Sequence, residues 1–267
     1  MKKLRRLVPF WIRAEFFRLR QTLRLLSDKK NYATLHSREH SKFPHLLFEH
    51  STPLFRDYPE PWYSTQFNKV HNLGLIQKRI SGLVLPPQTS FSYWKAVGRP
   101  LFLKGYKKAM VLQDGKIVNA MAGGLCQSSN ALFWGALNLG FTIEERHRHS
   151  YDIFPDTQRT LPFSTGATIF YNYLDLVFYN PFPYHYLLKI LLDDKNFTLQ
   201  IFSDQKPLFA FLIQEKNHLF IKEEDTIYRQ NEIWRQKVDT QTSALLSEDL
   251  LFKNKSKVLY EAEHLVS

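Results

Sequence analysis

The chain has 267 residues, of which 44% are hydrophobic and 15% aromatic, so it can bury a large core and form one or two domains. Its single cysteine, Cys126, excludes an internal disulfide framework and any metal site built from several thiolates. The net charge is +11, and residues 1–30 hold ten Lys or Arg against two acidic residues, which leaves the remainder nearly neutral.

The N-terminal segment, residues 1–26, is predicted to form a basic amphipathic helix. Apolar side chains such as Leu19 and Leu23 share one face, and Arg20 and Arg24 lie opposite. This helix either packs on its own domain or lies on an anionic membrane surface, because one apolar stripe serves both purposes. No nucleic-acid module follows the basic arm, so we expect no nucleic-acid partner.

The longest apolar run of that N-terminal segment is shorter than a bilayer span or a signal-peptide core. We therefore expect neither a transmembrane helix nor an export signal, and a cytoplasmic or peripheral membrane location. Residues 28–65 contain four prolines in a polar sequence and are predicted to be an irregular connection with short structured pieces. A helix is predicted over 66–81, where Gly82 ends it.

Strand patterns dominate the chain after residue 100, with β-branched and aromatic residues between turn residues. The expected strands are 109–113 and 116–120 around the hairpin dipeptide Asp114-Gly115, 141–154, 167–179, 185–192 and 197–202 as a second hairpin, 208–213, 218–222, 227–237 and 258–260.

A buried helix is predicted over residues 127–139, which are apolar nearly all round, and Gly140 provides its C-terminal stop. Gly123 and Gly124 precede it and allow a turn that a residue with a Cβ atom resists. Cys126 therefore stands at the start of a helix, where unpaired N–H groups and the positive dipole end favour a thiolate. The alternative is that Cys126 is a small buried hydrophobe without a chemical role.

Two histidines downstream of the cysteine are candidates for a base. On the strand predicted there, Glu145, His147 and His149 share one face, and either imidazole can accept a proton from a thiol. Arg146 lies on the other face. Its planar guanidinium can bind a carboxylate, or it can form a structural ion pair with Glu145 or its neighbour Glu144.

Six motifs stand in a characteristic order: Phe91-Ser92-Tyr93-Trp94, Val97-Gly98-Arg99, Lys104-Gly105-Tyr106-Lys107, Gly123-Gly124-Leu125-Cys126-Gln127, Glu145-Arg146-His147-Arg148-His149-Ser150 and Gly166-Ala167-Thr168. Their order and spacing resemble those of the VanW family, over residues 66–204. The chain departs from the usual pattern at Ala122, which replaces the first of three glycines and is strained if the turn requires a positive φ.

The resemblance implies a role in peptidoglycan metabolism and glycopeptide (vancomycin) resistance. Some members of the family are L,D-transpeptidases, in which the cysteine of this motif attacks a stem peptide and passes the acyl group to an amine. By this resemblance Cys126 is the nucleophile, His149 the base and His147 the reserve base. The substrate contacts that we expect are Arg146, Gly123, Gly124, Gln127 and Ser128.

A thiolate forms an acyl-enzyme without a metal, so we expect no cofactor and no metal, and a peptidoglycan stem peptide or precursor as partner. A non-catalytic accessory protein that binds cell-wall precursors or the membrane surface is the alternative. A zinc hydrolase built on His147 and His149 is a weaker third, because the flanking arginines repel a cation. The sequence leaves the oligomeric state open.

The expected fold is α+β: mainly antiparallel sheet, with a buried helix starting at the Gly-Gly-Leu-Cys turn and an N-terminal amphipathic helix. We expect the basic helix and connection over residues 1–65, a VanW-like domain over 66–204, and a β-rich extension over 205–267 packed on the same body.

Overall fold

The computed structural model describes residues 10–113, 116–148, 151–152, 161–171 and 173–265. Its elements in chain order are α1 (Phe10–Ser27), η2 (His40–Lys42), β1 (His45–Pro53), α2 (Trp62–Ile80), β2 (Val84–Leu85), β3 (Ser90–Ser92), α3 (Tyr93–Val97), η3 (Phe102–Lys104), β4 (Lys108–Gln113), β5 (Lys116–Met121), α4 (Cys126–Asn138), β6 (Thr142–Glu145), β7 (Tyr151–Asp152), β8 (Val177–Tyr179), β9 (Tyr186–Leu192), β10 (Asn196–Ser203), β11 (Phe209–Glu223), β12 (Thr226–Asp239), β13 (Leu245–Val258) and η4 (Glu263–Leu265).

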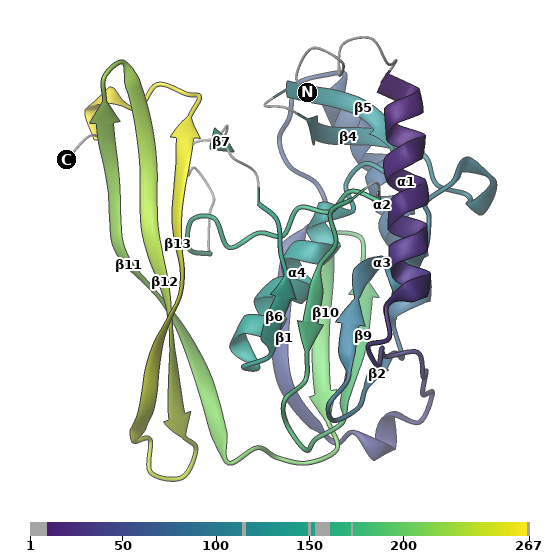
Figure 1. Ribbon diagram of the computed structural model, residues 1–267, viewed down its shortest axis with the longest axis vertical. Coiled ribbons are helices and arrows are strands. Elements are labelled where there is room, and N and C mark those ends of the chain that lie inside the picture. Colours follow the sequence, from purple (N-terminus) through teal and green to yellow (C-terminus); the bar gives the residue numbers. More distant parts are fainter. Residues whose placement is uncertain (1–9, 114–115, 149–150, 153–160, 172, 266–267) are drawn as a thin grey trace.

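The described strands form four sheets, in the orders β1-β10-β9-β2, β11-β12-β13-β7, β3-β8-β6 and β4-β5. Neighbouring strands are antiparallel, except for the short parallel pairing of β13 with β7. The fold is therefore α+β with mainly antiparallel sheet, as the sequence predicts. Figure 1 shows α4 between the β1-β10-β9-β2 sheet and the long β11-β12-β13 sheet, with α1 along the far side.

The central helix is α4, because its side chains are apolar on nearly every side. Gly135 lets it approach the β1-β10-β9-β2 sheet, since a Cβ atom there would lie 2.8 Å from Ile201 Cδ1. Its fully buried Phe133 meets Phe252 of β13, with ring centroids 5.9 Å apart. Gly140, with a φ of +74°, ends the helix as predicted. Cys126 is thus mounted on a helix that both large sheets hold in place.

The two hairpins that the sequence predicts are confirmed. Strands β4 and β5 pair with Ala109 opposite Ala120, and the turn residues Asp114 and Gly115 lie outside the described residues. Strands β9 and β10 pair across a turn in which the Asp193 carboxylate accepts backbone N–H bonds. The predicted helix at 66–81 is present as α2, which begins four residues earlier, at Trp62.

The strand predicted over residues 141–154 is much shorter, because β6 ends at Glu145. Directly afterwards, the Arg146 side chain donates a hydrogen bond of 3.0 Å to the Gly166 carbonyl. The Thr168 N–H then donates to the His147 carbonyl at 2.8 Å. Residues 146–148 are therefore held by a loop from elsewhere in the chain, whereas Tyr151 and Asp152 form the separate strand β7, which pairs with β13.

The strand predicted over residues 167–179 is also shorter, and among its described residues the strand that forms is β8. The Ala167 N–H is taken by the side-chain oxygen of Asn130 on α4, at 2.7 Å. Further on, the Leu174 N–H bonds the Phe170 carbonyl at 2.9 Å and closes a turn. Local β-propensity is overridden here by a hydrogen bond from the distant Asn130 and by a turn within the segment itself.

The C-terminal sheet is more continuous than the sequence predicts. Segments 208–213 and 218–222 join into the single strand β11, which bulges between Lys216 and Leu219. Most of β13 is missing from the prediction because its buried positions are polar. The buried Asn254, for example, donates to the equally buried Asn231 of β12 at 2.8 Å.

The helix α1 has two different faces. One face packs on the body, where Ala14 is buried, Phe17 meets the Tyr173 ring and Arg24 pairs with Glu145. The outward face carries an exposed apolar stripe at helical spacing, from 42% exposed for Ile12 to 78% for Leu26. The stripe consists of Ile12, Phe16, Leu19, Leu23 and Leu26. Among the described helices, none is long and apolar enough to cross a lipid bilayer.

Candidate active site

A tight turn precedes the cysteine. Ala122 has a φ of +57° and Gly124 a φ of +87°, both in the left-handed region. Gly123 has no room for a side chain, because a Cβ atom would lie 2.2 Å from the carbonyl oxygen of Ala109. The turn therefore needs the two glycines, and Ala122 adopts the strained conformation that the missing third glycine would relieve.

Cys126 is the first residue of α4 and is half-buried. Burial raises the pKa of its thiol above the ordinary value. The backbone N–H groups of Ile169 and of Cys126 itself work against burial, because their hydrogen bonds to the sulfur lower the pKa. The helix start alone predicts a more acidic thiol, and the structure adds a larger opposing effect of burial.

The two polar residues after the cysteine take different roles. Gln127 joins α4 to β1, because its side-chain N–H₂ donates to Thr52 Oγ1 at 2.8 Å and to the backbone at the end of the strand. Ser128 is fully buried, shares a 2.8 Å hydrogen bond with the Tyr93 hydroxyl and donates to the Leu125 carbonyl. Gln127 lines the cavity beside Cys126, whereas Ser128 is buried and is not among the residues that line it.

The imidazole of His147 lies 3.0 Å from the Glu145 carboxylate. Burial of Glu145 is outweighed by its hydrogen bonds with His147 and Arg24, which lower its pKa to about 2. Within the described residues, no hydrogen bond joins an imidazole to the Cys126 thiol. His149, predicted as the base, lies outside the described residues, so its role stays a prediction.

The Arg146 side chain fixes the loop that contains Ser164 and Gly166. Its guanidinium donates to the carbonyls of Gly166 and Ser164 and lies over the rings of Phe133 and Phe252, 4.7 and 4.9 Å from their centroids. Burial lowers its pKa to about 10, which leaves it charged at neutral pH. None of the carboxylates that the structure describes pairs with this guanidinium, so the expected ion pair with Glu144 or Glu145 is absent there.

A cavity of about 1270 Å³ opens beside Cys126, large enough to hold a short peptide. It lies between β1, α2, the β4-β5 hairpin, the start of α4 and residues 161–171. Its charged lining is mostly basic and favours an anionic ligand. The charged residues of the lining are Arg18, Arg56, Lys69, Arg99 and Arg148, with Asp57 and Asp152.

Two titratable residues that line this cavity, His50 and Lys69, are not predicted from the sequence. His50 supplies the one imidazole among the described residues of the lining, and burial lowers its pKa, which keeps it neutral. Burial, with the nearby charge of Arg56, lowers the pKa of Lys69 to about 8. Neither residue belongs to a sequence motif. His50 stands in a segment predicted to be irregular, and Lys69 stands on a helix whose orientation toward the cavity depends on tertiary packing.

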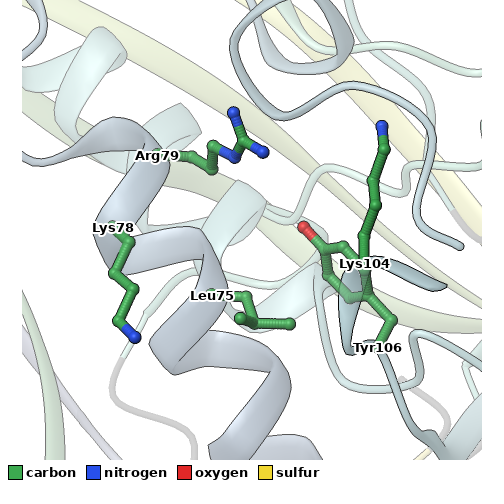
Figure 2. Close-up of a pocket in the computed structure, with 5 residues that line it drawn as sticks. All are labelled: Leu75, Lys78, Arg79, Lys104 and Tyr106. Carbon is green, nitrogen blue, oxygen red and sulfur yellow. The ribbon is translucent and has the colours of Figure 1, made fainter. Parts of the chain in front are cut away.

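A second, smaller pocket of about 330 Å³ lies at the other end of α2. Figure 2 shows the five side chains that line it: Leu75, Lys78, Arg79, Lys104 and Tyr106. The Tyr106 ring is buried, and burial raises the pKa of its hydroxyl. The described residues that line this pocket do not line the cavity beside Cys126, so its lysines serve as controls for the cavity.

Fold and site together define an α+β protein with a cysteine at a glycine turn, facing a basic cavity. The sequence matches the family described as VanW like protein over residues 68–202. It is 31% identical over 217 residues to Vancomycin B-type resistance protein VanW of Enterococcus faecalis, a match that covers 81% of this chain and 79% of that protein. The chain therefore belongs to the VanW family.

A second relative is the Uncharacterized protein YoaR of Bacillus subtilis. It is 28% identical to this chain over 144 residues, which are 54% of this chain and 46% of that protein. No solved structure matches the chain. The cysteine turn and the cavity beside it lie mostly inside the matched region.

Proposed function

We propose that this protein acts on peptidoglycan stem peptides or their precursors in glycopeptide resistance, with Cys126 as the nucleophile of an acyl transfer. The observation that carries the proposal is the position of Cys126, at the start of a rigid helix and in the wall of a basic cavity of about 1270 Å³. The name of the Enterococcus faecalis relative supports the link to resistance.

In the proposed reaction the Cys126 sulfur attacks a peptide carbonyl of the donor stem. The thiol proton passes to a base and from there to the nitrogen of the leaving amine, while the carbon–nitrogen bond breaks and a thioester forms. An acceptor amine then attacks the thioester, forms a new amide bond and releases the thiol. No oxidant or metal is consumed in either step.

The reaction needs a base, because burial raises the pKa of the Cys126 thiol. His149 is the base that we predict from the sequence, with His147 as reserve. His50 is a further candidate: it shares a face of β1 with Thr52, which bonds Gln127 beside the cysteine. Single replacements of the three histidines by alanine rank them, and we expect the largest loss of acyl transfer for His149.

The decisive experiment incubates the full chain with a stem tetrapeptide and an acceptor amine. Mass spectrometry is expected to detect a thioester on the peptide that contains Cys126, and the transferred product. The near-isosteric Cys126→Ser variant keeps the packing of α4 and is expected to show neither, with an unchanged unfolding midpoint. Unchanged turnover in that variant would overturn the proposal.

The outward apolar stripe of α1 favours a second role, and we propose that it binds an anionic membrane surface. Five large apolar side chains are exposed on one face of the helix, and the body of the protein does not cover them. The ten basic residues among the first thirty match the charge of anionic lipids. This contact would hold the protein at a membrane through the helix that also pairs Arg24 with Glu145.

Vesicle sedimentation tests this role. The chain is expected to bind vesicles that contain anionic lipid and to bind zwitterionic vesicles weakly. The double variant Leu19→Ser/Leu23→Ser should lose binding, whereas Leu212→Ser, which changes another exposed leucine, on β11, should retain it. Equal binding by both variants would exclude α1 as the contact.

A further inference from the structure

The side chain of Lys69 is fixed beside the cysteine turn. It extends from α2 across Gly124, so closely that a Cβ atom at Gly124 would lie 2.1 Å from Lys69 Cγ. Both residues line the cavity beside Cys126. The glycine therefore makes room for the lysine stem as well as for the turn, and the ammonium group is carried into the cavity wall.

Arg56 is brought to the same place by a buried glutamine. The backbone N–H of Arg56 donates to Gln66 Oε1 at 2.9 Å, and Gln66 Nε2 donates back to the backbone carbonyl of Arg56 at 2.8 Å. Gln66 is 2% exposed and stands three residues before Lys69, on the same side of α2. This clamp fixes the backbone of Arg56 next to Lys69, and the two charges are close enough to lower the pKa of Lys69.

These two cations have no anionic partner in the part of the chain that the structure describes. The ion pairs and side-chain hydrogen bonds there include neither the Lys69 ammonium nor the Arg56 guanidinium. The two described acidic residues of the cavity do not pair with these cations. Asp152 forms an ion pair with Arg229, and Asp57 forms no ion pair with either Lys69 or Arg56. Two like charges, one of them partly desolvated, repel each other until an anion binds between them.

We propose that Lys69 and Arg56 form a carboxylate-binding subsite, which anchors the carboxylate of a peptide ligand beside Cys126. The planar guanidinium of Arg56 can bind both carboxylate oxygens, and the Lys69 ammonium adds a second charge from the turn side. The peptide nature of the ligand rests on the proposed function, whereas the recognition of a carboxylate rests on two cations that pair with no described carboxylate.

Binding to the Cys126→Ser chain, which cannot form a thioester, tests the subsite without turnover. The probes are a stem tetrapeptide with a free C-terminal carboxylate, its C-terminal carboxamide, and the same peptide with its side-chain carboxyl groups amidated. We expect the fully acidic peptide to bind at least about tenfold more tightly than one of the two amides. That amide identifies which carboxylate the subsite takes.

Lys69→Met and Arg56→Met are each expected to weaken the binding of the acidic peptide about tenfold. Each should also abolish the difference in affinity between the acidic peptide and its amidated form. Lys78→Met is the matched control, since this exposed lysine is on the same helix but lines the smaller pocket (Figure 2). Equal affinities of the Cys126→Ser chain for all three peptides would overturn the subsite. So would a loss of affinity in Lys78→Met as large as the loss in Lys69→Met or Arg56→Met.

A measurement on the unmodified chain covers the case in which a variant fails to fold. Acetic anhydride labels neutral amines, and the acidic peptide is expected to protect Lys69 from labelling severalfold without protecting Lys78. A lack of protection at saturating peptide contradicts the subsite. Thioester formation is scored separately: protection without a thioester refutes the acyl transfer alone, and a thioester without protection refutes the subsite alone.

Discussion

Gly123 lies directly against the backbone of Ala109, and a Cβ atom at Gly123 would stand 2.2 Å from the Ala109 carbonyl oxygen. The contact joins the cysteine turn to the first strand of the β4-β5 hairpin, whose second strand leads into that turn. Because the obstacle is backbone rather than a flexible side chain, it cannot move aside without shifting the hairpin.

Gly123→Ala is expected to destabilise the protein by roughly 2 to 3 kcal/mol, because the added methyl group overlaps a fixed carbonyl. Urea unfolding monitored by tryptophan fluorescence measures the loss. Gly74→Ala in α2 is the matched control. Its nearest neighbour, Leu192 Cδ1, lies 4.0 Å away, and replacing a helical glycine should stabilise by about 0.5 to 1 kcal/mol. Equal effects of the two variants would contradict the close contact.

Arg146→Lys is expected to cost roughly 2 to 4 kcal/mol of stability, because an ammonium cannot serve two carbonyls and stack on two rings. The measurement is again the free energy of unfolding. Arg38→Lys, at an exposed position, should change it little. If Arg146 instead serves only to bind ligand, peptide affinity falls while stability stays unchanged.

Asp175 links stability to pH in the acidic range. Burial raises its pKa to about 6, although hydrogen bonds from Ser92, Trp94 and Leu176 oppose the shift. Between the unfolded pKa of 3.8 and about 6, the folded state binds more protons than the unfolded state. This group therefore lowers the free energy of unfolding as pH rises through that window, by roughly 3 kcal/mol in total.

Asp175→Asn should remove this slope, because an amide keeps the acceptor for both backbone N–H groups and can donate to Ser92. The difference in unfolding free energy between variant and unmodified chain is measured in urea from pH 4 to 7. We expect the variant to gain relative stability with rising pH. A constant difference across the range would show that Asp175 has an ordinary pKa in the folded protein.

Iodoacetamide alkylation measures the state of Cys126. Because burial raises the thiol pKa, the folded chain is expected to react roughly tenfold more slowly at pH 7 than a free cysteine, with a rate that keeps rising to higher pH than that of a free cysteine. The urea-unfolded chain serves as the reference for a free thiol. Fast alkylation that does not vary between pH 6 and 8 would instead indicate a resting thiolate.

Much of the site follows from local sequence patterns. Gly123 and Gly124 predict a turn, the apolar run after Cys126 predicts a buried helix, and both are present. The family motifs place the cysteine in the turn by comparison alone. These features are predictable because each depends on the backbone preferences and periodicity of adjacent residues.

Other features depend on contacts between segments far apart in the chain. Strand β6 stops at Glu145 because Arg146 binds the carbonyl of Gly166, and a local pattern contains no information about that partner. The sequence likewise leaves open which way the α1 stripe faces, since either packing or a membrane explains an amphipathic helix, and the structure directs the stripe outward.

The α+β class, the turn, the helix that carries Cys126 and the membership in the VanW family can all be read from the amino-acid sequence. The surroundings of the sulfur depend on the three-dimensional packing: burial raises the thiol pKa, and the cavity wall brings Lys69 and Arg56 together with no anionic partner among the described residues. Desolvation and charge proximity depend on packing between distant residues, and the periodicity of a sequence does not encode that packing.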